Sequence, residues 1–312
     1  MKIPVAVRRQ MWALIDGMRL TKLPPVTLRF DGFNLPAGIV FSRDRPLQLD
    51  ALIRSFFECA VVPCRLRILY SVSDERYGKA YEEIEALYRN APVEFYREEK
   101  VGGFRHGLLA ILEQTYEDSL FFLVDDIIFT EQVDVKLLSD LVASGFIPTL
   151  RLGRNLNWCY TMHRKQPLPA LRKLGSRRCQ DLQATGHDLW AWRWISGQLD
   201  WGYPLSLDGN AFSSMEIRRV VGALDFEAPN SLEIALQKYK DSFLGRWGVC
   251  YGKSRLVNLP LNLVQREIAN RTVGIDKEIF LKAWEAGKRI NTAPMRGFQN
   301  TSAHQEVDLD FS

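Results

Sequence analysis

The chain has 312 residues, 46% of them hydrophobic and 25% charged, which is an ordinary composition for a globular protein. Its 41 basic and 37 acidic residues give a net charge of +4, and the basic residues are scattered, so a nucleic-acid partner is not expected. Five cysteines without paired spacing fit neither a disulfide framework nor a zinc site, which favours a reducing, cytoplasmic location. No segment approaches the ~18–20 continuous apolar residues of a membrane span.

The sequence predicts an N-terminal helix and extension over residues 1–35. Arg8, Arg9 and Arg19 interrupt the apolar core that a signal peptide would need. Two alternatives remain for the helix: it packs on the body of the protein, or it lies as an amphipathic segment on an acidic bilayer. The second alternative predicts peripheral association with the inner face of the plasma membrane.

Residues 36–150 alternate short apolar strands with helices, which predicts βαβ units in an α/β fold. The expected strands are 38–41, 66–72 and 93–96. The expected helices begin at Pro46, run from 77 to 89, and follow Gly102 and Gly103. We therefore expect a Rossmann-like mixed sheet flanked by helices, and Asp44 is expected to cap the first helix.

The most informative segment is 120–129, an apolar run that is interrupted by Asp125 and Asp126. Such a run is typical of a strand buried on both faces, and carboxylates there are costly to bury without a cation or hydrogen-bond donors. Adjacent side chains on a regular strand point to opposite faces, so both aspartates serve one site only if the chain turns there. A helix cap or a surface pair is the alternative reading of the two aspartates.

In the second half, 151–264, residues 151–212 are rich in Trp, Gly, Pro and Arg, and 265–312 is expected to form a helical extension with one helix (277–288) and a polar tail. A hairpin is expected over 196–210, and alternation predicts that Trp190, Trp192 and Trp194 share one face of a strand. Two capping boxes are expected to begin helices, and they pair Ser213 with Glu216 and Asn230 with Glu233. The four ranges together predict a single two-lobed domain.

The order of these pieces resembles the nucleotide-sugar-dependent glycosyltransferases of the GT-A fold, particularly the bacterial family 2-like enzymes. The resemblance covers about residues 36–265. In chain order it rests on the Ser-Arg-Asp-Arg-Pro turn at 42–46, Asp74, the Gly-Gly-Phe-Arg segment at 102–105, Asp125-Asp126, and the Asp-Gly-Asn-Ala-Phe turn at 208–212. It implies an enzyme that moves a sugar from a nucleoside-diphosphate sugar to a hydroxyl of a glycan or glycolipid acceptor, in bacterial surface polysaccharide synthesis.

The resemblance also implies roles for particular side chains. Residues expected to bind the nucleotide sugar are Ser42, Arg43, Arg45, Asp74, Gly103, Arg105 and Asp125. Asp126 is expected to hold a divalent metal, Mn²⁺ or Mg²⁺, with His304 folding back from the tail as a further ligand. The family motif is Asp-x-Asp, whereas position 127 here is Ile. A turn or cap role for Asp74, and a disordered tail around His304, are the structural alternatives.

The acceptor side is expected in the second half. Family members carry a Glu-Asp pair at a helix start, but the matching positions here are Asn230 and Ser231. Asp208 and Glu233 are therefore the expected catalytic base, acting jointly. The aromatic residues expected to contact an acceptor sugar are Trp192, Trp194, Trp201 and Tyr203, although core packing is the alternative for at least two of them.

Two other functions compete with sugar transfer. A sugar-phosphate nucleotidyltransferase would carry a Gly-rich loop after the first strand, whereas this chain has arginines there. A non-catalytic carbohydrate-binding protein on the same fold is the second alternative. It is favoured by the missing second aspartate of the family motif and by the missing Glu-Asp pair.

Overall fold

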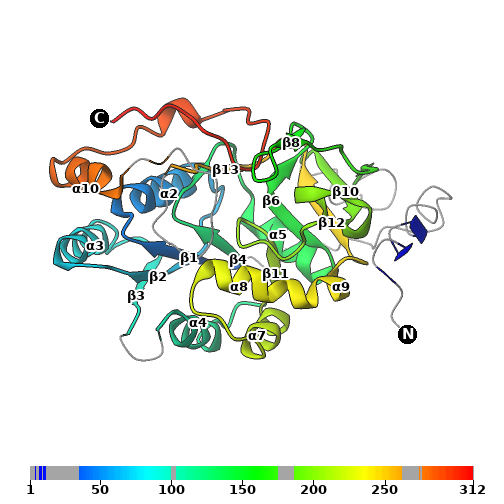
Figure 1. Cartoon of the computed structure of the whole chain (residues 1–312), viewed down its shortest axis with the longest axis horizontal. Helices are drawn as coiled ribbons and strands as arrows, with labels where there is room; N and C mark the ends of the chain where they lie inside the picture. Colours follow the sequence, from blue (N-terminus) through cyan, green and yellow to red (C-terminus); the bar gives the residue numbers. More distant parts are fainter. Residues whose placement is uncertain are drawn as a thin grey trace.

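A computed structural model describes residues 4, 7–8, 10–11, 35–99, 103–174, 186–261, 274 and 276–311. Two β-sheets lie next to each other and helices surround them (Figure 1). The first sheet has the strand order β11-β4-β1-β2-β3 and is parallel except for β11. Its strands are β1 (Ala37–Arg43), β2 (Leu66–Ser71), β3 (Val93–Arg97), β4 (Ser119–Val124) and β11 (Ala211–Ser213). The expected mixed α/β sheet with a parallel core is confirmed.

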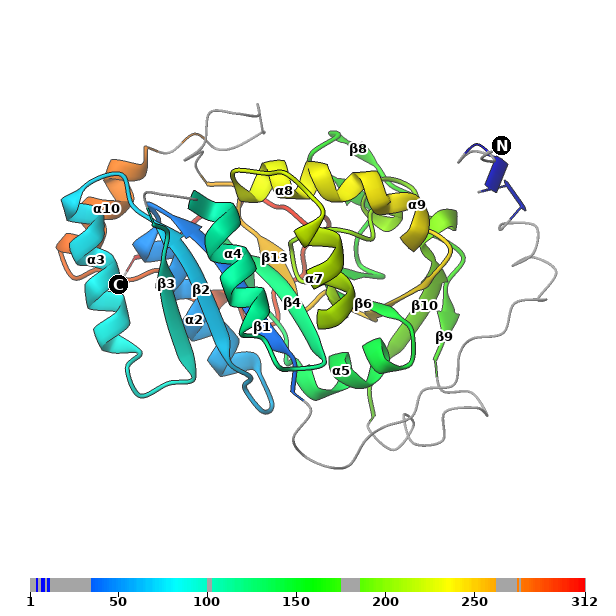
Figure 2. The ribbon, with the colours of Figure 1, turned by 90° about the horizontal axis from the view of Figure 1, so that it is seen from below.

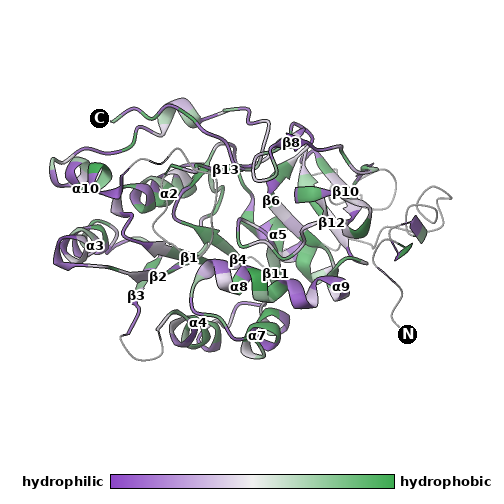
Figure 3. Cartoon of the chain, in the orientation of Figure 1, coloured by the Kyte–Doolittle hydropathy of each residue, from purple (hydrophilic) through white to green (hydrophobic). Residues whose placement is uncertain are grey.

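Helices cover both faces of this sheet, and the alternation of β1 explains why. Ile39 and Phe41 face one apolar core, whereas Val40 between them faces the other. On one side lie α2 (Pro46–Cys59), α3 (Glu75–Leu87) and α10 (Lys277–Glu285); on the other lie α4 (Gly103–Glu113) and α7 (Ser214–Gly222) (Figures 1 and 2). Figure 3 shows hydrophobic residues on the central strands β4 and β11 and hydrophilic ones on the peripheral helix α3.

The second sheet has the strand order β6-β12-β10-β9. Its strands are β6 (Ile147–Gly153), β12 (Trp247–Tyr251), β10 (Leu189–Arg193) and β9 (Arg172–Lys173). Two further pairs of short strands lie outside these sheets: β5 (Ile127–Phe129) pairs with β13 (Leu256–Asn258), and β7 (Trp158–Cys159) pairs with β8 (Arg164–Lys165). The other helices of the described residues are α5 (Val135–Ala143), α8 (Pro229–Leu236), α9 (Lys240–Phe243), η1 (Trp194–Ser196), η2 (Leu199–Gly202), η3 (Gln237–Tyr239) and η4 (Ala293–Met295).

The two halves of the chain share the first sheet. β11 comes from the predicted acceptor half and pairs with β4, and the backbone N–H of Leu150 in β6 donates to the carbonyl of Gly209 at 2.9 Å. The predicted boundaries at 36, 151 and 265 stay predictions. The single domain of two lobes likewise stays a prediction.

The turn between β4 and β5 is the feature that creates the site. β4 ends at Val124 and β5 begins at Ile127, so Asp125 and Asp126 form a turn between two strands. The parallel neighbour β1 ends at the same edge, where the N–H of Asp125 donates to the carbonyl of Phe41 at 3.1 Å. The chain therefore turns where the adjacent aspartates required it.

Two local expectations are wrong. Asp44 does not cap α2: Arg45 is the N-cap, and Asp44 adopts a left-handed φ of 52°. The segment 196–210 contains the turn η2 in place of a hairpin, and the indole N–H of Trp192 in β10 donates to the carbonyl of Trp201 at 3.0 Å and holds this turn against the second sheet. Near the end of this segment, Gly209 adopts a φ of 80°.

The predicted capping boxes are also wrong, although both helices exist. Ser213 is the N-cap of α7 but makes no side-chain cap hydrogen bond, and Glu216 pairs with Arg246 instead. α8 begins at Pro229, where the hydroxyl of Ser231 accepts from the N–H of Ala228 at 2.9 Å. Glu233 therefore has no capping role and is available for another one.

The C-terminal segment folds back onto the body of the protein. The indole N–H of Trp284 in α10 donates to Glu83 at 2.7 Å. Further along, the N–H of Asn258 donates to the carbonyl of Ala303, and the N–H of Gln305 donates back to Asn258, both at 3.0 Å. The tail therefore adds a strand-like segment beside β13.

Other expectations concern redox state and membranes. Four of the cysteines lie in the described ranges, and all four are buried free thiols; the fifth, Cys179, lies outside these ranges, as does most of the predicted N-terminal helix. Within the described part of the chain, no helix combines the length and the apolar character needed to cross a bilayer.

Candidate functional site

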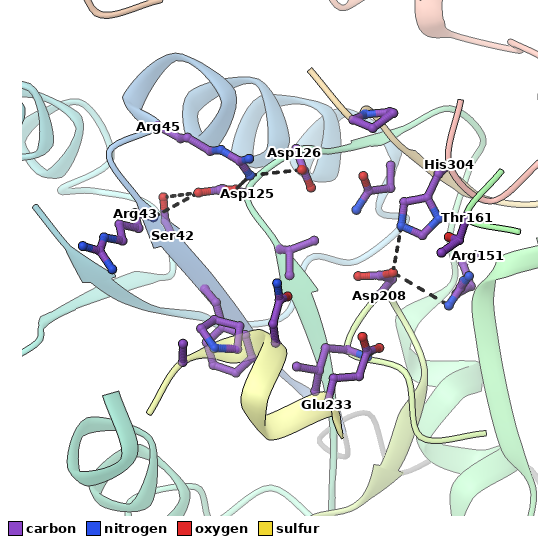
Figure 4. A pocket seen from close by; sticks show the side chains of 18 of the residues that line it. Ser42, Arg43, Arg45, Asp125, Asp126, Arg151, Thr161, Asp208, Glu233 and His304 are labelled. Atoms are coloured by element: carbon purple, nitrogen blue, oxygen red, sulfur yellow. Dashed lines mark hydrogen bonds and ion pairs between the residues drawn. The ribbon is translucent and has the colours of Figure 1, made fainter. Parts of the chain in front are cut away.

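A cavity of about 1390 Å³ opens between the carboxyl ends of the first sheet and the second lobe. Such an edge is where ligands bind in open α/β sheets. One wall is formed by the ends of β1 and β4 and carries Arg43, Arg45 and the two aspartates (Figure 4). The opposite wall is formed by β6, the loop before β11, α8 and the C-terminal segment. Its charged residues are Arg151, Asp208, Glu233 and His304 (Figure 4).

Arg45 links the two aspartates of the first wall. Its Nη1 lies 2.8 Å from Oδ1 of Asp125 and 3.0 Å from Oδ2 of Asp126. The second oxygen of Asp125 accepts from the hydroxyl of Ser42 at 2.9 Å and from the N–H of Arg43 at 3.1 Å. Asp125 is therefore held by three donors, and Ser42 serves to position it.

Asp126 is held less completely. Its Oδ1 is buried and has no hydrogen-bond partner among the described residues. Burial raises the pKa of Asp126 to about 7; Arg45 opposes the rise, while Asp125 and Asp208 add to it. A buried carboxylate oxygen without a donor is costly unless a ligand supplies one, so this atom is a candidate contact for a bound substrate.

The loops after β1 and β2 are joined at the rim of the cavity. Oδ1 of Asp44 accepts from the N–H of Ser73, and its Oδ2 pairs with Nζ of Lys277, both at 2.7 Å. The aspartate thereby connects the end of β1 to the loop after β2 and to the start of α10. Lys277 also lines the cavity. The sequence predicted only that it begins a helix, so its place in the cavity could not be predicted.

Asp208 is presented by a turn that only glycine completes without strain. Gly209 follows it with a φ of 80°, and a Cβ at this position would lie 2.8 Å from Cδ2 of Leu256 and 3.3 Å from Cβ of Leu150. Its N–H donates to the carbonyl of Phe122 in β4 at 2.7 Å. The turn is thus fixed to both sheets, and it directs Asp208 into the cavity.

Gly209→Ala is expected to lower the free energy of unfolding by about 1–2 kcal/mol for the left-handed backbone, with an added penalty for the contact with Leu256. Urea unfolding measures the change. Gly222→Ala is the matched control, because open space surrounds a Cβ there and the residue ends helix α7. Equal stability of the two variants would contradict the strain argument.

Arg151 is the buried cation of the opposite wall. It is 4% exposed, and its guanidinium lies 2.7 Å from Asp200 and 3.7 Å from Asp208. Nη1 also donates to the hydroxyl of Ser206 at 2.7 Å. The sequence did not single out Arg151, although a charge within the apolar strand segment Ile147–Gly153 is the same signal that identified the two aspartates.

Glu233 lies on α8 and belongs to the same wall of the cavity as Asp208 and Arg151 (Figure 4). Its Oε1 accepts from the N–H of Leu207 at 3.1 Å. Burial raises the pKa of Glu233 to about 7; Asp208 adds to the rise and Arg151 opposes it. A carboxylate with a pKa near neutrality is well matched to accept a proton at physiological pH.

His304 enters the same cluster from the C-terminal segment. Its Nε2 lies 3.5 Å from Oδ2 of Asp208, and its ring lies 6.5 Å from that of Tyr160. Burial lowers the pKa of His304, opposed by Asp208. The tail therefore does fold back to the cavity, but His304 contacts Asp208 and not Asp126.

The first wall does not fit a metal ion held by the protein. No group of three or more His, Cys, Asp or Glu that could bind a cation exists within the described ranges. Of the four oxygens of the two aspartates, three accept from Ser42, Arg43 or Arg45, and only Oδ1 of Asp126 remains open. The expected ligand pair of Asp126 and His304 is not formed.

Three of the four expected acceptor aromatics belong to the core. Trp192, Trp194 and Trp201 are each 0% exposed, and the ring of Trp192 lies 4.6 Å from that of Trp194 and 4.9 Å from that of Trp201. They pack against one another under the second sheet and cannot reach a sugar. Tyr203 does line the cavity, beside Lys240, whose Nζ lies 5.4 Å from its ring centroid.

Two expected donor residues have structural roles instead. The guanidinium of Arg105 donates to the carbonyls of Leu224 and Gly222, at 2.9 and 3.2 Å, so it fixes the end of α7. Asp74 caps α3 by accepting from the N–H of Arg76 at 2.9 Å and of Tyr77 at 3.2 Å. Gly103 begins α4 with a φ of 53° and is not part of the cavity wall, while Gly102 lies outside the described ranges.

Asp74→Ala tests this assignment. Loss of the cap is expected to lower the free energy of unfolding by about 0.5–2 kcal/mol. Nucleotide affinity is expected to stay unchanged, because Asp74 does not reach the cavity. Unfolding in urea and calorimetric titration measure the two quantities. A weakened affinity at unchanged stability would return Asp74 to the donor site.

Comparison with known proteins supports the resemblance that the motif order indicated. No protein-family model matches the chain. A curated relative, the bifunctional glycosyltransferase pgtA of Dictyostelium discoideum, is 23% identical over 200 residues, and the match covers 60% of this chain and 25% of that protein. The chain thus spans about a quarter of the length of this relative.

Solved structures were also compared with the chain. GalNAc-T7 with UDP, GalNAc and Mn²⁺ is 14% identical, with a TM-score of 0.44 over 81% of this chain and 48% of that one. TarS 1–349 of S. aureus with UDP is 12% identical, with a TM-score of 0.44 over 80% of this chain and 65% of that one. Both TM-scores lie below 0.5. The curated relative is named a glycosyltransferase, and with it the resemblance predicted from the sequence is confirmed as a resemblance.

Proposed function

We propose that this protein is a glycosyltransferase that moves a sugar from a nucleoside-diphosphate sugar to a hydroxyl group of an acceptor. The observation that carries the proposal is one cavity with two chemically different walls. The first carries arginines around an aspartate pair, and the second carries Glu233 and Asp208 around the buried Arg151. A group-transfer reaction with an anionic leaving group needs both kinds of wall.

The first wall suits the donor. Breaking the bond between the anomeric carbon and the phosphate leaves negative charge on the nucleoside diphosphate. Arg43 and Arg45 lie where that charge would develop, at the carboxyl end of β1 and the start of α2. Oδ1 of Asp126 is an open acceptor for a sugar hydroxyl. Metal assistance, which the family resemblance implied, is not part of this proposal because the ligand set does not fit.

The second wall suits the acceptor. Glu233 accepts the proton of the attacking hydroxyl, since its pKa of about 7 leaves a substantial fraction ionised at neutral pH. Asp208, held between Arg151 and His304, raises the basicity of Glu233 by its negative charge. Tyr203 offers a flat surface for the apolar face of a sugar. A glycan or glycolipid of surface polysaccharide synthesis is the acceptor class that we propose.

Two measurements test the proposal. Thermal unfolding with UDP, GDP or ADP should show stabilisation by at least one of them, because a ligand bound to the native state raises its stability. Incubation with nucleotide sugars should release a nucleoside diphosphate. Absence of stabilisation by every nucleotide would overturn the proposal. Release of pyrophosphate would instead identify a nucleotidyltransferase, and glycan binding without turnover would identify a carbohydrate-binding protein.

A further inference from the structure

The contact of Arg45 with both aspartates at once is a further feature of the first wall. One nitrogen of its guanidinium, Nη1, contacts both members of the aspartate pair, at 2.8 and 3.0 Å. The side chains of Arg45, Asp125 and Asp126 are only 10%, 4% and 12% exposed. Charge pairs with so little solvent are screened weakly and are held firmly when their geometry is good.

The positive charge at this position is permanent. Burial acts to lower the pKa of Arg45, but Asp125 and Asp126 outweigh it, and the pKa of the guanidinium is raised. Its backbone N–H donates to the hydroxyl of Tyr81 at 3.3 Å, so main chain and side chain are both fixed. A divalent cation at the same carboxylates would have to share their oxygens with a charge that cannot be titrated away.

We propose that Arg45 is the resident cation of the aspartate pair and binds the diphosphate in the position where a divalent metal ion would otherwise act. This inference rests on the proposed function. In this arrangement Asp125 and Asp126 orient the guanidinium, and Arg43 is a second arginine that lines the cavity. Guanidinium groups bind phosphate oxygens through paired N–H donors, so the chemistry needs no metal ligand set.

The departure from the Asp-x-Asp motif at Asp125 and Asp126 has the same explanation. An Asp-x-Asp motif would direct two carboxylates to one face of a strand. Here Ile127 occupies the position of the second aspartate of that motif, and it is 0% exposed in the core. The adjacent Asp126 is instead brought beside Asp125 by the turn, and the two carboxylates surround a guanidinium nitrogen. The adjacent spacing of the two aspartates therefore fits the guanidinium of Arg45 and does not fit a metal ion.

Nucleotide affinity in EDTA and in Mn²⁺ decides the inference with the unmodified protein. Titration calorimetry with UDP and GDP is expected to give dissociation constants that agree within about threefold between the two conditions, a difference below ~1 kcal/mol. Affinity that disappears in EDTA and returns with Mn²⁺ would overturn the inference and leave the proposed function standing. Absence of nucleotide binding in both conditions would overturn the proposed function, and this inference with it.

Arg45→Gln adds a second measurement. It is expected to weaken nucleotide binding in EDTA by about 10–100-fold, the loss of charge-assisted hydrogen bonds. Because the freed carboxylates become available to a cation, Mn²⁺ is expected to restore part of the affinity in this variant only. Arg45→Lys, which keeps the charge, serves if Arg45→Gln does not fold, and a smaller loss is expected. Arg89→Gln, on an exposed residue after α3, is the control. Unchanged affinity in both Arg45 variants would contradict the inference.

Discussion

Glu233→Gln is expected to reduce turnover by about 10²–10⁴-fold while leaving nucleotide affinity unchanged. The reason is that a glutamine keeps the shape of the side chain and its hydrogen bond from Leu207, but it cannot accept the proton of the acceptor hydroxyl. Steady-state release of nucleoside diphosphate measures turnover, and calorimetry measures affinity. A variant that loses affinity and turnover equally would place Glu233 in donor binding and not in proton transfer.

Glu227→Gln is the matched control. Glu227 also lines the cavity, but it is exposed and precedes α8. The pH profiles of the two variants separate their roles further. In the unmodified protein, activity should rise with pH through about 7, because Glu233 must lose its proton to act as a base. This limb should persist in Glu227→Gln and be absent from the residual activity of Glu233→Gln.

The raised pKa of Glu233 also affects stability: as the pH rises, activity increases but the free energy of unfolding decreases. Because the folded state holds the Glu233 proton more tightly than the unfolded chain, its contribution to stability is largest below the ordinary carboxylate pKa. That contribution is lost as the pH rises through about 7. Glu233→Gln should therefore be more stable than the unmodified protein above neutrality and equal to it in acid. Urea midpoints across pH measure this, and a constant difference would contradict it.

The sheet and its acidic edge could be predicted from the sequence because both depend on local patterns. The apolar run 120–129 and its alternation with helices identify a central strand, and two carboxylates inside such a run are costly to bury without a cation or hydrogen-bond donors. The need for a turn at Asp125 and Asp126 followed from side-chain direction alone. Local chemistry therefore identified the first wall of the cavity.

The direction of longer side chains could not be predicted in the same way. A strand of alternating tryptophans looks the same whether Trp192 and Trp194 face a core or a ligand, and the second sheet places them inside. Arg45 and Arg105 both follow turn signals, yet the guanidinium of one reaches the aspartate pair and that of the other reaches the end of α7. These outcomes depend on which segments pack together, which spacing does not encode.

The second wall combines segments that are far apart in the sequence. Arg151 comes from β6, Asp208 from the turn before β11, Glu233 from α8 and His304 from the tail. The sequence indicated Asp208, Glu233 and His304 as separate candidates, but it did not indicate Arg151, the cation that balances the two acids. A buried arginine among carboxylates is a stronger indication of a site than any one of the acids, because its burial requires the acids to be there.

Arg151→Met is expected to lower the free energy of unfolding by about 3–5 kcal/mol, the usual result of removing one partner from a buried charge cluster. The methionine fills much of the volume, so the loss reports the charge and the hydrogen bond to Ser206 more than packing. Asp200 and Asp208 would be left without their shared cation. Arg151 also opposes the rise in the pKa of Glu233, so its removal makes that carboxylate costlier to ionise, and the loss should be larger at a pH of about 8 than at a pH of about 5.

Arg76→Met is the control for this prediction. Arg76 makes contacts of 2.7 and 3.0 Å with Glu285 and Glu278, yet its side chain is 46% exposed. Solvent screens an exposed pair and its side chains lose entropy when they associate, so the control should change stability far less than Arg151→Met. Chemical unfolding of both variants makes the comparison. Equal losses in the free energy of unfolding would mean that burial of Arg151 does not set the strength of the cluster. The assignment of Asp208 and Glu233 to a shared, charge-balanced site would then have to be abandoned.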